Sequence, residues 1–276
     1  MRNSIIAVCL TALISLSTPL IAADTQPSTA YTEIQSTLNQ LFQMRLATQR
    51  SIGAFYMFNG QEQDQRYAKI AADNATQAAR YLWSLTAPES TAVESLKVQL
   101  LDDFSAYSRQ LDRLISAIQK QGYSDLQPVA DLAVLNSSIL KNSHALALLI
   151  AQEQQYTAPE LTQLAREQSL LMQSIAADYA ARSASVGASF FADGEKQPLD
   201  QLSKQFARNF LVLKNHPNNN PSIKQSLRAI EVKWRYIENS LKNYNENSVP
   251  FVIDKFARSI TQSLEQVAAQ YALLNI

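Results

Sequence analysis

Along almost the whole chain from residue 30 onward, apolar residues recur at steps of three and four positions, with polar residues between them. This spacing gathers the apolar side chains on one side of an α-helix, whereas the strict alternation of a half-buried strand is rare. Residues 30–58 show the pattern clearly, since Ile34, Leu38, Leu41 and Ile52 trace one side. The pattern predicts an all-α protein.

Glycine, proline and capping residues divide the pattern into eight helical segments. Ser90 is typical of a helix start, Gly122 of a helix end, and Pro250 of a first helical turn. The predicted helices cover residues 30–58, 64–85, 90–122, 125–154, 157–191, 199–214 and 222–243, and an eighth begins at residue 249.

Four of the five glycines lie in a segment that occurs twice, at residues 51–60 and again at residues 185–194. Glycine is costly inside a helix and useful just past its end, so a repeated glycine pair indicates one local geometry built twice. We expect a close helix approach at Gly53 and a left-handed helix end at Gly60, with the same pair repeated in the second copy. The chain is therefore interpreted as a duplication.

Four amphipathic helices joined by short turns bury their apolar stripes most simply as an up-down bundle. The duplication then predicts two tandem four-helix bundles, at residues 24–156 and 157–276. The alternative is one elongated array in which the fourth and fifth helices merge into a single rod across residues 156–160.

The first 23 residues have the order of a secretory signal peptide. A positive charge at Arg2 precedes an apolar run at residues 5–16, and small residues end it at Ala22 and Ala23. We expect cleavage near Ala23 and a periplasmic protein; an uncleaved signal anchor is the alternative. The single cysteine, Cys9, lies inside this segment, so the mature chain has no disulfide, thiolate chemistry or iron–sulfur cluster.

The overall charge limits the possible partners. The chain has 24 Lys and Arg residues and 24 Asp and Glu residues, so its formal net charge is zero. Electrostatic binding to nucleic acid or to an anionic membrane needs a basic excess, and neither is expected as a partner. With 46% hydrophobic residues the chain can bury a real core.

Residues 164–173 read Leu-Ala-Arg-Glu-Gln-Ser-Leu-Leu-Met-Gln. This run resembles the helix-one signature of the PilJ-type extracellular sensor module of type IV pilus chemotaxis transducers and, more distantly, of NarX-type nitrate sensors. Phe206, Leu213, Leu227 and Trp234 fall where that family has Phe, Leu and Trp, so the resemblance covers roughly residues 159–271. It implies a helical sensory domain, here without the membrane helix and cytoplasmic signalling domain that usually follow.

In the nitrate-sensing relatives, helix-one arginines bind the anion at a dimer interface. Glu167 and Ser169 stand at the two arginine positions of this chain, and the first copy offers Glu33 and Gln35. The resemblance therefore implies the sensory architecture, with a possible homodimer, but no nitrate site.

Three arginines are the candidate ligand-binding residues. Arg45, Arg50 and Arg182 are predicted to bind a carboxylate or small anion if they face a bundle interior or a dimer seam. The alternative is that they are solvated helix-surface arginines.

Nothing in the sequence indicates catalysis, a metal site or a cofactor. Bundle metal sites use paired Glu-x-x-His units, and neither Asp103 nor His144 belongs to one. We expect no enzyme activity, no metal and no cofactor. Seven aromatic residues have the helical spacing of core residues rather than of a ligand pocket. These are Tyr56, Phe58, Trp83, Phe190, Phe191, Trp234 and Tyr236.

The sequence thus predicts a soluble periplasmic sensory module that binds a small-molecule ligand and acts with a membrane signalling partner. The alternative is a scaffold or interaction protein of the cell envelope, with a protein partner and no small ligand.

Overall fold

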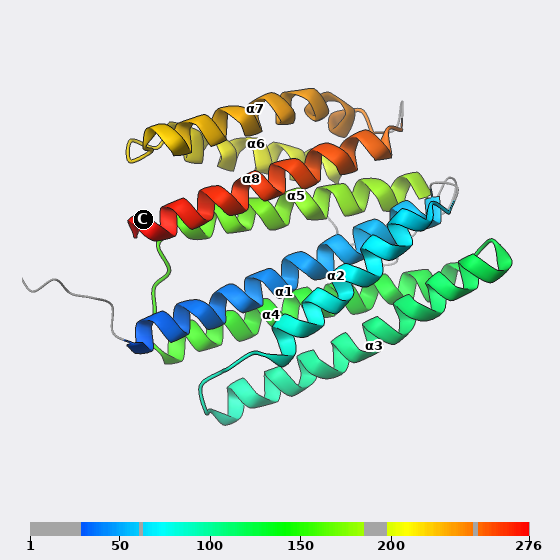
Figure 1. Cartoon of the computed structure of the whole chain (residues 1–276), viewed down its shortest axis with the longest axis horizontal. Coiled ribbons are helices and arrows are strands. Elements are labelled where there is room, and N and C mark those ends of the chain that lie inside the picture. The colour runs from blue at the N-terminus through cyan, green and yellow to red at the C-terminus, as the bar shows by residue number, and fades with distance from the viewer. Residues whose placement is uncertain (1–28, 61–62, 185–197, 245–247, 276) are drawn as a thin grey trace, which may run out of the picture.

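The computed structural model describes residues 29–60, 63–184, 198–244 and 248–275, and the regular elements in these ranges are all helices (Figure 1). They are α1 (Thr29–Gly60), α2 (Gln65–Trp83), α3 (Thr91–Gln121), α4 (Leu126–Glu153), α5 (Glu160–Ala184), α6 (Leu199–Asn215), α7 (Pro221–Lys242) and α8 (Pro250–Leu274). The predicted all-α class is confirmed. The predicted signal peptide and the second glycine segment lie outside the described residues.

Local capping explains several of the helix boundaries. Ser90 Oγ accepts a hydrogen bond from the Val93 amide at 3.2 Å and starts α3, and Gly122 ends it with φ +86°. Asn220 accepts from the Ile223 amide at 2.9 Å and starts α7. The predictions that Ser90 starts a helix and that Gly122 ends one are therefore confirmed.

Two hydrophobic cores lie side by side. Helices α1–α4 surround one, to which α5 adds Ala177, Ala180 and Ala181, and α5–α8 surround the other. We call α1–α4 and α5–α8 the first and second helix groups. Tyr56, Phe58 and Trp234 are buried, as predicted. The prediction that Trp83 and Tyr236 pack in a core is wrong, because Trp83 is 72% exposed at the last residue of α2 and Tyr236 is 65% exposed on the outer side of α7. Phe190 and Phe191 lie outside the described residues.

The chain reverses direction between the two groups. Helix α4 ends at Glu153, Gln155 has φ +50°, and the Tyr156 amide donates to the Ala151 carbonyl at 2.8 Å. The Tyr156 ring packs against Tyr31 with centroids 4.9 Å apart. Helices α4 and α5 are therefore separate and run in opposite directions (Figure 1), and the alternative of one continuous rod is wrong.

Helices α1 and α5 lie next to each other in the middle of the molecule and run in the same direction (Figure 1). Along the contact, the residue numbers increase in the same direction on both helices, so the two helices are parallel. Arg166 lies over the Phe42 ring at 5.5 Å, Leu170 packs with Phe42 and Leu46, and Gly53 faces Ala177. The steps of four and seven between these positions match the seam of a parallel coiled coil. We call this contact the α1–α5 seam.

Gly60 has a different role from the predicted one. It is the last residue of α1 and lacks the positive φ of a left-handed cap. A Cβ added there would lie 2.7 Å from the Ala184 Cβ, whereas one added at Gly53 would lie 3.5 Å from the Ala177 Cβ, an ordinary contact. The close approach therefore occurs at Gly60, and the predicted turn at this residue is wrong.

The second helix group repeats the pattern of buried positions of the first. The buried positions of α4 recur in α8 with the same spacing, and the core-facing positions of α1 recur in α5. Examples are Leu132 and Ile253, Ile139 and Ile260, Leu146 and Val267, and Phe55 and Tyr179. Buried positions of the first group thus correspond to buried positions of the second.

This packing sets a register different from the one predicted from the glycines. It pairs Gly53 with Ala177 rather than with Gly187, which lies outside the described residues. In the same register, Glu167 corresponds to Gln43 and Ser169 to Arg45, and the predicted correspondence with Glu33 and Gln35 is wrong. The reason is that apolar spacing determines how the helices pack, and this spacing recurs every few residues independently of the glycines.

Candidate functional site

The middle of the α1–α5 seam is polar although it is buried. Gln49, Gln168 and Gln173 are each at most 6% exposed. Among the described residues, the Oε1 atoms of Gln168 and Gln173 have no hydrogen-bond partner. Burying an amide oxygen without a partner costs about 1–3 kcal/mol. The seam therefore contains buried acceptor oxygens to which no described residue donates a hydrogen bond.

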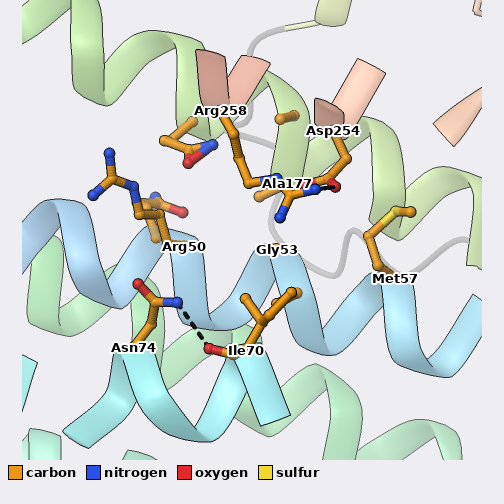
Figure 2. A pocket seen from close by; sticks show the side chains of 12 residues that line it. Arg50, Gly53, Met57, Ile70, Asn74, Ala177, Asp254 and Arg258 are labelled. Atoms are coloured by element: carbon orange, nitrogen blue, oxygen red, sulfur yellow. Dashed lines mark hydrogen bonds and ion pairs between the residues drawn. The ribbon is translucent and has the colours of Figure 1, made fainter. Parts of the chain in front are cut away.

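One recess opens beside the seam where α1, α2, α5 and α8 meet, with a cavity volume of about 40 Å³ (Figure 2). Its charged side chains come from α1 and α8, so both helix groups contribute to it. Figure 2 shows Arg50, Asp254 and Arg258 around the point where Gly53 faces Ala177. We call it the charged recess. Its polar lining residues are Gln49, Arg50, Asn74, Gln173, Asp254 and Arg258.

A second recess lies next to α4 and α6 and has a volume of about 220 Å³. Gln49 and Ala177 line both recesses. In the same correspondence of buried positions, the second recess is the counterpart of the charged one. One alanine and two serines occupy the corresponding positions there. The pairs are Arg50 and Ser174, Asp254 and Ala133, and Arg258 and Ser137.

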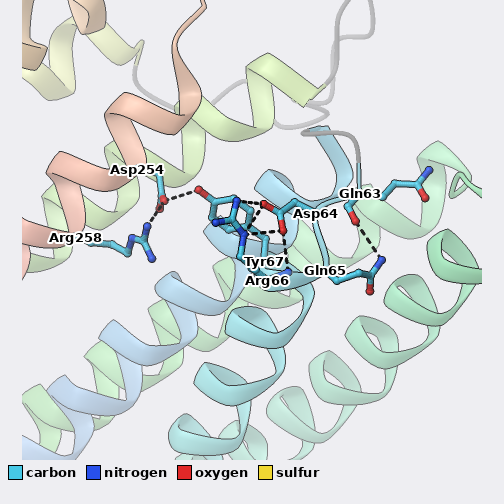
Figure 3. Close-up of polar contacts among 7 residues, drawn as sticks. All are labelled: Gln63, Asp64, Gln65, Arg66, Tyr67, Asp254 and Arg258. Atoms are coloured by element: carbon cyan, nitrogen blue, oxygen red, sulfur yellow. Dashed lines mark hydrogen bonds and ion pairs between the residues drawn. The ribbon is translucent and has the colours of Figure 1, made fainter.

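Two polar contacts at the charged recess join the helix groups. Arg50 on α1 forms an ion pair with Glu265 on α8, with Nη2 and Oε2 2.5 Å apart. The Tyr67 hydroxyl on α2 donates to Asp254 Oδ2 at 3.0 Å, and the same carboxylate pairs with Arg258 at 2.8 Å (Figure 3). Each of these two contacts holds α8 against a helix of the first group.

Asp254 is the carboxylate whose charge is most affected by this environment. Burial raises the pKa of Asp254 above its ordinary value, while Arg258 and the hydrogen bond from Tyr67 act in the opposite direction. Burial and the nearby Asp254 carboxylate raise the pKa of Tyr67, which therefore stays protonated and donates. By contrast, Asp64 at the start of α2 is half-buried, and hydrogen bonds from Arg66 lower its pKa (Figure 3).

The structure does not bring the three predicted arginines together. Arg45 lies between α4 and α5, where burial lowers its pKa and Glu167 opposes that shift. Arg50 lies in the charged recess, and Arg182 lies over the Tyr244 ring at 4.9 Å. Arg45 and Arg50 are five positions apart on one helix and point to different sides of it, which explains the separation.

Sequence reasoning missed the rest of the charged recess. Asp254 and Arg258 form an i,i+4 pair, which in sequence is indistinguishable from an ordinary surface pair on a helix. Their role depends on the position of α8 next to α1 and α2, and no local signal reports that. The buried Gln173 lies within the run that resembles the sensor signature, but its residue type alone gave no reason to select it.

Asp103 has structural partners. It accepts hydrogen bonds from Ser138 at 2.7 Å and from Asn142 at 2.8 Å. The part of the chain that the structure describes contains no group of three residues able to hold a metal ion. Within the same residues, every helix is too short or too polar to cross a bilayer.

No protein-family model matches the chain. No curated protein matches it, and no solved structure matches it. The resemblance to PilJ-type sensors stays a prediction from sequence, and the interpretation of the site depends on its geometry.

Proposed function

We propose that the chain is a periplasmic sensory module that binds a small molecule in the charged recess and acts with a membrane signalling partner. One observation carries the proposal: Arg50, Asp254 and Arg258 converge beside the buried Gln173, whose Oε1 has no partner among the described residues. A recess with a few convergent polar groups, built where two structural units meet, is the usual form of a small-molecule site.

The duplication argues that these charges serve binding rather than assembly. The second recess packs the corresponding helices with Ser174, Ala133 and Ser137, so a seam of this kind forms without the charged set. The Arg50 and Glu265 side chains are 26% and 21% exposed, and in a partly buried ion pair the cost of desolvation offsets much of the attraction. Such weak stabilisation does not account for three charged residues in one recess.

A ligand in this recess would touch four helices from both groups. Its binding energy would therefore favour the relative position of the groups in which the recess is closed. The seam has small residues at two of its contacts, Gly53 with Ala177 and Gly60 with Ala184, so few interlocking side chains oppose a shift. Such a shift would change the face that the module presents to a partner. The N-terminal sequence supports a periplasmic location.

A thermal-shift screen tests the proposal. The mature chain from Asp24 is heated with amino acids, organic acids, inorganic anions and nucleotides. A ligand at about one hundred times its Kd adds about 2.7 kcal/mol, which for a chain of this size raises Tm by roughly 5–10 °C. A saturable shift supports a binding module, and the absence of any shift across the whole set contradicts it.

A scaffold or interaction role in the cell envelope is the second candidate, favoured by an apolar face on α7 and α8. Val232 is 71% exposed, and the exposed Tyr236 packs its ring on Phe256 with centroids 4.7 Å apart. Large exposed apolar side chains that lie together indicate a protein-binding surface. Capture of one reproducible envelope protein that Tyr236→Lys abolishes, with no small-molecule shift, would favour this function.

A further inference from the structure

We infer that the ligand of the charged recess is a small zwitterion of the amino-acid class, of the size of glycine or alanine. This inference rests on the proposed function and names the ligand chemistry of the same site. It follows from three properties of the recess: the spare donors of its arginines, the acceptor oxygens that line it, and its balance of charge.

The donors belong to Arg50 and Arg258. Arg50 uses Nη2 in its ion pair with Glu265, and Arg258 uses Nη2 in its ion pair with Asp254. A guanidinium carries several N–H donors in a fixed planar arrangement, so each side chain keeps donors for a second carboxylate. The carboxylate of a ligand can therefore bind without breaking either pair.

The acceptors are amide and carboxylate oxygens. Gln173 is 4% exposed, and its Oε1 lacks a partner in the part of the chain that the structure describes. Asn74 donates its amide hydrogen to the Ile70 carbonyl at 2.8 Å, which orients its oxygen as the remaining polar atom (Figure 2). Asp254 adds a carboxylate. An ammonium group supplies donors to these oxygens, whereas a simple anion supplies none.

The balance of charge points to a ligand with no net charge. The two arginines are matched by Asp254 and Glu265, so the recess and its ion-pair partners are neutral. Adding a lone anion or cation would leave an uncompensated charge in a partly buried place, which is unfavourable. A zwitterion brings both charges and leaves the sum unchanged.

The size of the recess limits the ligand. A volume of about 40 Å³ holds about three water molecules at roughly 10–15 Å³ each. A recess of this size favours the smallest amino acids, glycine and alanine, over one with a side chain as large as that of leucine. The second recess lacks both cations, so one ligand binds per chain.

Isothermal titration calorimetry with glycine and L-alanine tests this inference on the mature chain. Acetate and methylammonium serve as the lone anion and the lone cation, and L-leucine tests size. We expect one site per chain for glycine or alanine and binding at least about tenfold weaker for the other three probes, a difference worth about 1.4 kcal/mol.

Two variants locate the site. Arg258→Gln is expected to weaken glycine or alanine binding by about tenfold or more, since it removes a charge-assisted hydrogen bond. The matched control is Ser137→Ala, at the corresponding position of the second recess, which should leave affinity within about twofold. Gln173→Met removes the free acceptor without touching an ion pair, and it serves if Arg258→Gln does not fold.

Each result decides the question. Acetate bound as tightly as glycine, or glycine binding unaffected by both recess variants, would overturn the zwitterion inference. If neither glycine nor alanine binds while another compound in the thermal screen does, the inference fails and the proposed function stands. If no compound binds at all, both fail.

Discussion

Tyr107 on α3 donates a hydrogen bond to Ser51 on α1, with Oη and Oγ 2.9 Å apart and both residues fully buried. Ser51 donates in turn to the Ala71 carbonyl on α2, also at 2.9 Å. These two hydrogen bonds join three helices of the first group through polar atoms inside an apolar core. Each member is satisfied only while the others are in place.

Ser51→Ala should therefore destabilise the protein by about 1–3 kcal/mol, because the Tyr107 hydroxyl loses its acceptor in the core. Chemical unfolding followed by circular dichroism gives the free energy. In the double variant Ser51→Ala with Tyr107→Phe, we expect part of the loss to be recovered, since no hydroxyl is then left unpaired. Additive losses in the double variant would show that the two groups do not depend on each other.

Gly60→Ala should destabilise the protein by about 1–3 kcal/mol, lowering Tm by roughly 2–12 °C. The added Cβ would lie 2.8 Å from the Ala184 Cα, which is backbone and cannot rotate away. Gly53→Ala is the matched control: its Cβ meets Ala177 at 3.5 Å, and alanine favours the helix by about 1 kcal/mol. Thermal unfolding of both variants checks the contrast, and equal Tm values would contradict the close approach at Gly60.

Asp254→Asn should gain stability relative to the wild type as the pH rises. Burial raises the folded-state pKa of Asp254 above its ordinary value of 3.8. Between these two values the folded state holds a proton that the unfolded state has lost, so the wild type is destabilised by this residue as pH increases through the window. Asparagine has no carboxyl group to titrate, so the variant carries no such penalty.

Unfolding free energies of both proteins from pH 3.5 to pH 7 measure this difference. The difference should move in favour of Asp254→Asn as the pH rises and become constant above the raised pKa. Movement in the opposite direction would mean that Arg258 and Tyr67 outweigh burial and lower the pKa of Asp254.

The two tryptophans should respond differently to a soluble quencher. Trp83 is 72% exposed, whereas Trp234 is 4% exposed and lies 4.4 Å from the Phe206 ring. Acrylamide should quench Trp83→Phe several-fold less than Trp234→Phe, and the emission of Trp83→Phe should lie further to the blue. Similar quenching of the two variants would contradict the placement of Trp83 outside the core.

Local signals predicted most of the helix boundaries. Ser90 and Gly122 act through hydrogen bonds and backbone angles within a few residues of themselves, so the sequence around them contains the whole cause. Gly60 shows the limit of this reasoning. Its neighbour Ala184 is far away in sequence, and a glycine that admits a helix looks the same in sequence as one that ends a helix.

The candidate site was harder to predict than the fold for the same reason. Arg50 was selected as one of three arginines, but its partners Glu265, Asp254 and Arg258 all lie on the last helix. Only the packing of α8 beside α1 brings these residues together. Apolar spacing predicts that one face of a helix is buried, but it does not predict which other helix covers that face. The prediction that Trp83 is buried was wrong for a different reason. Trp83 is the last residue of α2, and helical spacing does not show that the helix ends before this side chain reaches the core.

Because both helix groups belong to one polypeptide, their sequences do not have to be identical. Two copies of one subunit related by a true two-fold axis place the same side chains at both symmetry-related positions, so any change in one recess is made in the other as well. Here Arg258 and Ser137 occupy such related positions and differ. A substitution in this chain alters one recess and leaves its counterpart untouched, so the two can diverge separately in charge and in size.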